Sequence, residues 1–163
     1  MSDKKEKLTR REMREAAFLL LYQVELNGGS KADLGTITLD CVETFGLVLN
    51  SASVRLAEGV LDNKAVLDEI IGRYSSVRKV ERIPKINLTI MRMGLYEMDF
   101  MPEIPDKVAM NEAIELSKDY AYPPDSKLIS GLLGSRYKDK YKTKNGTNPC
   151  RGESGVPQDG EDE

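Results

Sequence analysis

The chain has 163 residues and a net charge of −3, and it contains no histidine. This length suits one domain, and the absence of His removes the commonest general base from any catalytic scheme. No apolar run approaches the roughly 20 residues needed to cross a bilayer, and the start, MSDKKEKLTRR, lacks the apolar core of a signal peptide. We therefore expect a cytoplasmic protein.

The first expected helix follows a basic flexible leader, residues 1–8. Thr9 and Glu12 have the spacing of a capping box, and the pattern runs to about Leu26 before Asn27-Gly28-Gly29. Residues spaced three or four apart share one side of a helix, and two such stripes can be recognised, one of them expected to face the core. The core stripe contains Met13, Ala16, Leu20 and Val24, and the neighbouring stripe contains Arg11, Glu15, Phe18 and Tyr22.

Two further helices are expected in the middle of the chain. The first covers Leu39 to Leu49, with Val42, Phe45, Val48 and Leu49 as its apolar positions. The second begins after Ser51 and Ser53 and runs to about Tyr74, with a bend near Asp62-Asn63.

Prolines divide the last third of the expected domain. Pro84 starts a helix that reaches about Met98, and Pro105 starts another that reaches about Tyr120. After Pro123-Pro124, Asp125 or Ser126 can cap a final helix that carries Leu128, Ile129, Leu132 and Leu133. The prediction is an all-α fold of six or seven helices over residues 9–142, followed by a disordered acidic tail over residues 143–163.

The sequence argues against an enzyme and gives no reason to expect a metal or a cofactor. It has no Gly-rich phosphate loop after a strand, no Cys-His pair and no acidic residues at metal spacing, and Cys41 and Cys150 are expected to be free thiols. Polar residues on the later helices, including Glu97, are expected to be structural, and we predict an ion pair between Arg92 and Glu112. The methionine group is expected to fill the core, with a protein-docking face as the alternative for part of it. This group contains Met91, Met93, Met98, Met101 and Met110.

The start of the domain has the chemistry of a surface for single-stranded RNA. Guanidinium groups contact phosphates through paired donors, and aromatic rings stack on unpaired bases. The leader and first helix supply Lys4, Lys5, Lys7, Arg10, Arg11 and Arg14, followed by Tyr22. The run Arg136 to Lys142 interleaves basic residues with tyrosines in the same way. A solvated helix start without a ligand is the alternative interpretation.

Several motifs resemble the NusB family of bacterial transcription antitermination factors. They are Arg10-Arg11 with Arg14-Glu15, Leu21-Tyr22-Gln23, Met91-Arg92 with Leu95-Tyr96-Glu97, Ile104-Pro105, Asn111-Glu112-Ala113-Ile114-Glu115-Leu116 and Lys127-Leu128-Ile129-Ser130-Gly131-Leu132-Leu133. The resemblance spans residues 8 to about 137.

The resemblance implies two packed three-helix bundles, no catalysis, and binding of a boxA-type single-stranded RNA together with the small-subunit ribosomal protein NusE. Such a pair acts in the RNA polymerase antitermination complex, notably in ribosomal RNA operons. The residues implied on the RNA surface are Arg10, Arg11, Arg14, Tyr22, Tyr74, Lys127 and Ser130. Asn87 and Met91 are implied nearer to the partner protein.

This chain departs from the family pattern at several of these positions. Leu128 and Ser130 stand where the family usually has Phe and Asn, and Gly134 replaces a usual Asp. Asn87 replaces a usual acidic residue, and Leu88 a usual basic one. Because stacking on an aromatic ring contributes about 1–3 kcal/mol per base, the departures predict weaker RNA binding than is usual in the family.

Two alternative functions belong to other classes of protein. One is a protein-interaction module that forms a homodimer through apolar helix faces, with little or no RNA binding. The other is an accessory domain of an RNA-modifying enzyme, since similar helical domains precede RNA methyltransferase domains. The second is disfavoured because 163 residues leave no room for a catalytic domain.

Overall fold

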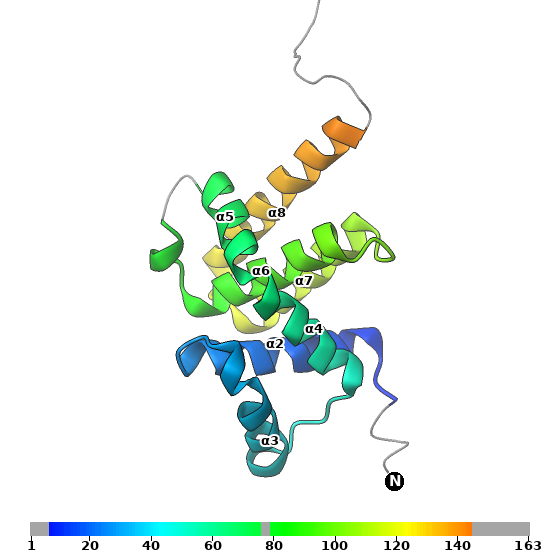
Figure 1. The fold of residues 1–163 in the computed structure, drawn as a ribbon. Helices are drawn as coiled ribbons and strands as arrows, with labels where there is room; N and C mark the ends of the chain where they lie inside the picture. Colours follow the sequence, from blue (N-terminus) through cyan, green and yellow to red (C-terminus); the bar gives the residue numbers. More distant parts are fainter. Residues whose placement is uncertain (1–6, 76–78, 145–163) are drawn as a thin grey trace, which may run out of the picture.

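The computed structural model describes residues 7–75 and 79–144, with side chains to residue 142, and this part of the chain is all-α (Figure 1). Its elements are α2 (Arg10–Leu26), the 3-10 helix η1 (Lys31–Asp33), α3 (Leu34–Phe45), α4 (Ser51–Asp62), α5 (Lys64–Tyr74), the 3-10 helix η2 (Val80–Arg82), α6 (Lys85–Phe100), α7 (Asp106–Tyr120) and α8 (Pro123–Lys144). The predicted fold class is therefore confirmed. Most of the predicted leader and of the predicted tail, with Cys150, lies outside the described residues.

Local signals set both ends of α2 as predicted. The Glu12 backbone N–H donates to Thr9 Oγ1 at 3.0 Å, and the Thr9 N–H donates to Glu12 Oε1 at 2.9 Å. The helix ends before Gly28 and Gly29, whose φ angles of 106° and 79° fall in the left-handed region that favours glycine. The capping box and the glycine pair thus fix where α2 begins and ends.

Helix α6 lies at the centre of the molecule and packs against α2, α4, α5, α7 and α8 (Figure 1). Its close approach to α7 and α8 depends on Gly94. A Cβ at this position would lie 3.1 Å from Ala113 Cβ and 3.2 Å from Leu133 Cδ1. Met91, Met93 and Met98 are buried in this core, so the alternative of a methionine docking face is wrong for these three residues.

Helix α3 differs from its prediction in position and in the residues that it buries. It begins at Leu34 rather than Leu39, and it buries Leu34, Ile37 and Cys41. Two of its predicted apolar positions are exposed, Phe45 at 70 % and Val42 at 42 %. The predicted range missed buried Leu34 and Ile37 because the helix begins five residues earlier, where Gly35 and the threonines weaken the hydrophobic pattern.

The other helix boundaries follow identifiable caps. Asn63 separates α4 from α5, and its Nδ2 donates to the Gly59 carbonyl at 2.8 Å, which turns the predicted bend into a break. Helix α8 begins at Pro123 rather than after a cap at Asp125 or Ser126, because proline fits a first helical turn. No helix in residues 7–75 and 79–144 is long and apolar enough to span a membrane.

Candidate nucleic-acid interface

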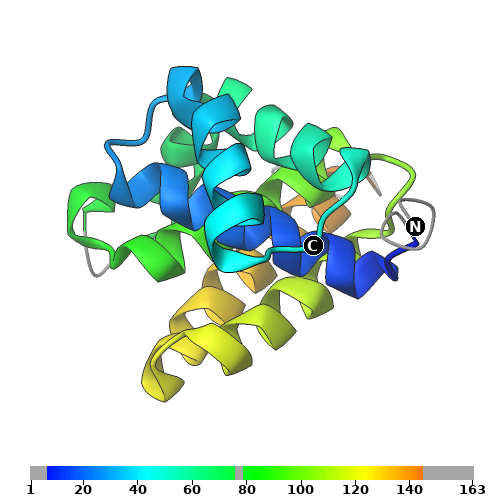
Figure 2. The ribbon, with the colours of Figure 1, turned by 90° about the horizontal axis from the view of Figure 1, so that it is seen from below.

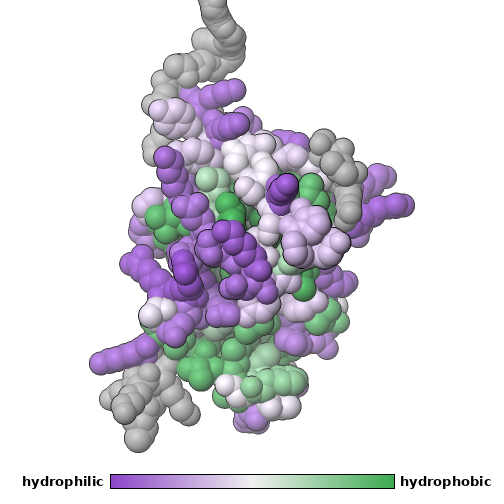
Figure 3. All heavy atoms as spheres, turned by 180° about the vertical axis from the view of Figure 1, so that it is seen from behind, coloured by the Kyte–Doolittle hydropathy of each residue, from purple (hydrophilic) through white to green (hydrophobic). Residues whose placement is uncertain are grey.

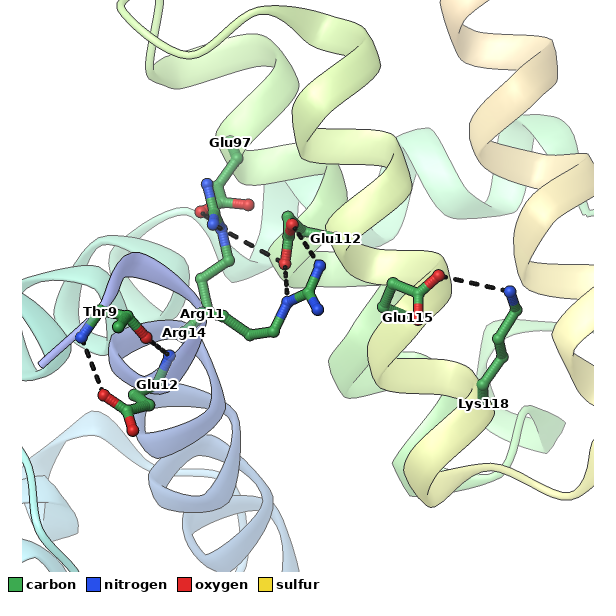
Figure 4. Close-up of polar contacts among 8 residues, drawn as sticks. All are labelled: Thr9, Arg11, Glu12, Arg14, Glu97, Glu112, Glu115 and Lys118. Atoms are coloured by element: carbon green, nitrogen blue, oxygen red, sulfur yellow. Dashed lines mark hydrogen bonds and ion pairs between the residues drawn. The ribbon is translucent and has the colours of Figure 1, made fainter.

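The first two turns of α2 contain three arginines that differ in their surroundings. Arg10 is exposed and forms no ion pair with any described residue. The Arg11 side chain, 66 % exposed, donates from Nε and Nη2 to the two carboxylate oxygens of Glu112 in α7 at 3.1 and 3.0 Å. Arg14 is only 3 % exposed, and its Nε donates to Glu97 Oε2 in α6 at 2.7 Å (Figure 4).

The burial of Arg14 corrects the expectation that it lies on an RNA-facing surface. The capping box places Arg14 one turn after Arg10, on the side of α2 that packs against α6. Glu97 is 2 % exposed, and Glu112 lies 4.0 Å from Arg14 Nη1. The guanidinium therefore neutralises buried carboxylate and holds α2 on α6.

The two carboxylates around these arginines have opposite pKa shifts. The hydrogen bond from Arg11 lowers the pKa of Glu112, with the charges of Arg11 and Arg14 adding to the effect. Burial raises the pKa of Glu97 even though Arg14 is beside it. Arg11 and Glu112 thus form a partly solvated pair, whereas Arg14 and Glu97 form a pair inside the core.

The predicted ion pair between Arg92 and Glu112 is wrong. Arg92 Nε and Nη2 donate to the Asp68 carboxylate in α5 at 2.7 and 2.9 Å, and Nη1 donates to Glu25 Oε1 in α2 at 3.0 Å. Arg92 therefore joins α6 to α5 and α2, and Glu112 is occupied by Arg11. The structural role of Arg92 was foreseen from sequence, but its partners were not.

The stripe that contains Arg11, Glu15, Phe18 and Tyr22 lies against α7. The Tyr120 hydroxyl of α7 donates to Glu15, the ring of Phe18 lies 4.9 Å from that of Tyr120, and the Phe18 and Tyr22 rings stack at 6.1 Å. Burial and the bond to Glu15 raise the pKa of Tyr120 to about 12. Tyr22 is therefore half-buried, with its ring orientation set by its neighbours.

Helix α7 connects this stripe to the start of α8. The Ser117 hydroxyl of α7 lies 2.8 Å from the Ser126 hydroxyl, and the next residue, Lys127, is exposed. In Figure 2 the end of α7, in yellow-green, turns back into the start of α8, in yellow, at the lower left. Arg10 at the start of α2 and Lys127 near the start of α8 thus each provide an exposed positive charge.

The remaining predicted residues gather around a pocket between α5, α6 and α8. Tyr74, Asn87, Met91 and Lys127 all line it, and its volume is about 280 Å³. Asn87 and Met91 are 2 % and 4 % exposed, so both are buried although they line this pocket. Ser130 is half-buried on α8 and is not among the residues that line it.

The basic run at the end of the domain is largely engaged within the protein. Arg136 Nη2 lies 3.1 Å from Asp99 Oδ2, and Lys140 Nζ lies 3.3 Å from Asp99 Oδ1 and 3.1 Å from the Asp106 carboxylate. The Tyr137 and Tyr141 rings stack on each other at 6.3 Å. Arg136 and Lys140 therefore attach α8 to α6 and α7.

Asp139 is a site residue that the sequence did not reveal. Its Oδ2 accepts a hydrogen bond from the Tyr74 hydroxyl at 2.5 Å, across 65 positions of the chain. Burial, followed by this bond, raises the pKa of Tyr74. No local pattern could have paired the two residues, because they lie on α5 and α8, which are separated in the chain by α6 and α7.

Comparison with known proteins identifies close relatives. The family model for the NusB family matches residues 11–138. Transcription antitermination protein NusB of Acetivibrio thermocellus is 36 % identical over 139 residues, which cover 84 % of this chain and 94 % of the relative. The protein of that name from Clostridium novyi is 33 % identical over 135 residues, or 80 % of this chain and 99 % of the relative.

Solved structures agree with this relationship. NusB of T. maritima superposes with a TM-score of 0.71 at 28 % identity, covering 85 % of this chain and 99 % of that one. A NusB structure in complex with NusE and double-stranded RNA gives a TM-score of 0.68 at 24 % identity and covers 80 % of this chain and 96 % of that one. The second likeness shows that the fold is shared.

Proposed function

This chain belongs to the NusB family, and we propose that it is a non-enzymatic transcription antitermination factor that binds a single-stranded boxA-type RNA together with the small-subunit ribosomal protein NusE. In this role the pair joins the RNA polymerase antitermination complex and promotes read-through, notably in ribosomal RNA operons, in the cytoplasm. Residues 9–142 form the RNA-binding domain in this proposal. The family match over residues 11–138 is the observation that carries it.

The described surface supports the RNA half of this proposal. Arg10 and Lys127 are exposed and without ion-pair partners among the described residues, so their charges are available to phosphates. Arg11 also contributes charge, although it must share its guanidinium with Glu112. Tyr22 and Tyr74 are partly exposed rings held by neighbours, and such rings can stack on bases without a large loss of side-chain freedom.

The proposal that the chain binds NusE is based on α6, the helix that follows Pro84. Asn87 and Met91 are proposed to lie near the ribosomal protein, and their pocket opens between α6 and α8. A partner seated over this opening would contact its rim rather than the buried side chains. The proposed RNA-binding surface and the proposed NusE-binding surface would then be adjacent at Lys127.

The test is the binding of a boxA-type RNA to the full chain, with and without NusE, over a series of salt concentrations. We expect binding that strengthens when NusE is added and weakens linearly as the logarithm of the salt concentration rises. Undetectable binding with NusE present would overturn the proposal. A scrambled RNA of the same composition serves as the control for non-specific attraction.

A homodimeric interaction module is the second candidate, and one observation favours it. The outer side of α3 exposes Leu39, Val42 and Phe45, and Figure 3 shows hydrophobic side chains gathered at the end of the molecule where α3 lies. Sedimentation with and without RNA separates the two functions. A dimer whose mass is unchanged by RNA would favour the interaction module.

A further inference from the structure

The outer side of α3 is an apolar surface that the rest of the described chain leaves in contact with water. Leu39, Val42 and Phe45 recur at every third position, and they are 62 %, 42 % and 70 % exposed. Val48, which follows the helix, is 48 % exposed, and Figure 3 shows hydrophobic side chains gathered at this end of the molecule. We call these four residues the α3 outer face. Single exposed apolar residues are ordinary, whereas a group of them marks an interaction surface.

A different side of α3 already anchors the helix. That side buries Leu34, Ile37 and Cys41, and the helix packs mainly on α2 and η1. A helix that is apolar over more than one side is typical of a helix that is covered on more than one side. The described chain covers only the inner side of α3, so the outer face is suited to a contact with another molecule.

The end of α3 holds Phe45 in place. Gly46 has a φ of 69°, in the left-handed region, and the Leu47 N–H donates to the Cys41 carbonyl at 3.0 Å. This is the hydrogen-bond pattern of a helix C-cap, and Leu47 packs against the core beside it. Phe45 therefore belongs to a formed last turn, and a partner that covers its ring does not have to order this segment first.

The charged residues of α3 are all acidic. Asp40 and Glu43 are exposed, and neither forms an ion pair with a described residue. Residues 34–50 contain no Lys and no Arg. Unlike charges across an interface favour association and like charges oppose it. A partner that carries cations beside its apolar residues therefore fits this surface best.

A second copy of the chain fits this surface less well. Two copies joined through α3 would bring Asp40 and Glu43 of both into one interface, without a Lys or Arg from residues 34–50 to offset them. The shape of the surface also favours a single helix as the partner. Helix α3 has 12 residues and is about 18 Å long, and its exposed positions at helical spacing form a ridge against which an amphipathic helix can pack.

We propose that the α3 outer face docks an amphipathic helix of a partner protein, in which Lys or Arg residues flank the apolar side. Phe45 is the central apolar contact, and Asp40 and Glu43 select for the cations. The inference goes beyond the proposed function, since neither Arg10 nor the pocket at Asn87 takes part. Figure 1 shows α3 on the other side of α2 from α7 and α8, so the docked helix leaves α8 accessible.

The experiment measures the binding of two designed peptides to the full chain, each of about 18 residues and so long enough to form a helix. Both carry Leu at helical spacing on one side and Ala elsewhere, and they differ only in having Lys or Glu beside the Leu residues. We expect the Lys peptide to bind more tightly and to shift the methyl NMR signals of Leu39 and Val42. Phe45→Ser should weaken this binding by about 30-fold, the size of an aromatic hot spot at an interface.

A charge reversal tests the chemistry of the partner. Asp40→Lys/Glu43→Lys should bind the Glu peptide more tightly than the Lys peptide, by up to about 5-fold for each exposed ion pair. Glu69→Lys/Glu103→Lys makes the same change in net charge on α5 and in the loop before α7, and it should keep the wild-type preference. Tyr122→Ser removes a ring that is also 70 % exposed, and it should bind the Lys peptide as the wild type does.

Three results would overturn the inference. One is a Lys peptide that leaves the Leu39 and Val42 signals unshifted, and another is a preference between the peptides that survives the reversal at Asp40 and Glu43. The third is a dimer in sedimentation that Phe45→Ser abolishes, because a second copy of the chain would then cover the outer face. None of these results bears on RNA binding, so the proposed function would still stand.

Discussion

The Arg14 guanidinium and the Glu97 carboxylate form an ion pair inside the protein, with Nε and Oε2 2.7 Å apart. Arg14 is 3 % exposed and Glu97 is 2 % exposed. The pair joins α2 to α6 directly beneath the exposed arginines of the α2 N-terminus. Arg14 thus has a structural role, whereas Arg10, one turn earlier in the same helix, is available to a ligand.

Replacing Arg14 with Met should lower the free energy of unfolding by about 3–5 kcal/mol, because the Glu97 carboxylate would remain buried without its partner. Urea denaturation followed by circular dichroism measures this loss. The double variant Arg14→Met/Glu97→Leu should recover most of it, since no buried charge remains. Arg10→Ala is the matched control and should change stability by less than about 0.5 kcal/mol. A single variant as stable as the wild type would contradict the structural role of Arg14.

Arg10→Ala and Lys127→Ala should each weaken RNA binding at low salt without changing thermal stability. Each exposed cation that contacts a phosphate adds about one unit to the salt dependence of the binding constant, so each variant should flatten the slope by about one. Fluorescence anisotropy over a salt series measures this slope. Arg55→Ala, an exposed arginine on α4, is the control and should leave the slope unchanged. Slopes identical to that of the wild type in both variants would remove these residues from the RNA surface.

Glu112 should stabilise the protein in a pH-dependent way. The hydrogen bond from Arg11 lowers the pKa of Glu112 below its ordinary value of 4.5. Its contribution is therefore present above about pH 4.5 and is lost as the pH falls through the folded-state pKa. Since Arg11 is 66 % exposed, we expect Glu112→Gln to cost only about 0.2–1 kcal/mol at pH 7.

Denaturation of the wild type and of Glu112→Gln between pH 7 and pH 3 tests this prediction. The difference between the two proteins should shrink toward zero at the acidic end and should also shrink at high salt. Glu103→Gln, in the exposed loop between α6 and α7, is the control. A difference that grows as the pH falls would show that the pKa shift has the opposite sign.

Gly59 and Gly134 should respond in opposite ways to the same exchange. A Cβ at Gly59 would lie 2.1 Å from Tyr96 Oη and 2.5 Å from Tyr96 Cζ, so Gly59→Ala forces a rigid ring to move and should cost about 1–3 kcal/mol. At Gly134 in α8 no atom lies within 4 Å of the added Cβ, so Gly134→Ala should stabilise by up to about 1 kcal/mol through helix propensity. Thermal denaturation of the two variants measures both effects. The double variant Gly59→Ala/Tyr96→Leu should be more stable than Gly59→Ala. If the two were equally stable, the clash with the Tyr96 ring would not be the cause of the lost stability.

Local sequence signals predicted the fold better than they predicted contacts. Thr9, Glu12 and the glycines after Leu26 set α2 because caps act within one turn, and Pro84 and Pro105 marked the starts of α6 and α7 in the same way. The side of α3 that is buried could not be predicted, because the start of that helix is set by packing on α2 and η1.

The surface positions of the predicted site residues could be foreseen only in part. Arg10, Tyr74 and Lys127 are at or near the surface as expected, whereas Arg14 is buried. An arginine that pairs with a carboxylate 83 positions away looks the same in sequence as one that faces solvent. The pocket at Asn87 was likewise invisible, since its walls come from three helices that meet only in the folded chain.

Helix α3 packs mainly on α2 and η1, and part of its hydrophobic side is in contact with water. A segment anchored on one side only loses little burial when it detaches, so its amide protons should exchange with deuterium sooner than those of α6, which has neighbours all around. Gentle warming would then release α3 as a local unfolding event while the centre of the molecule stays intact.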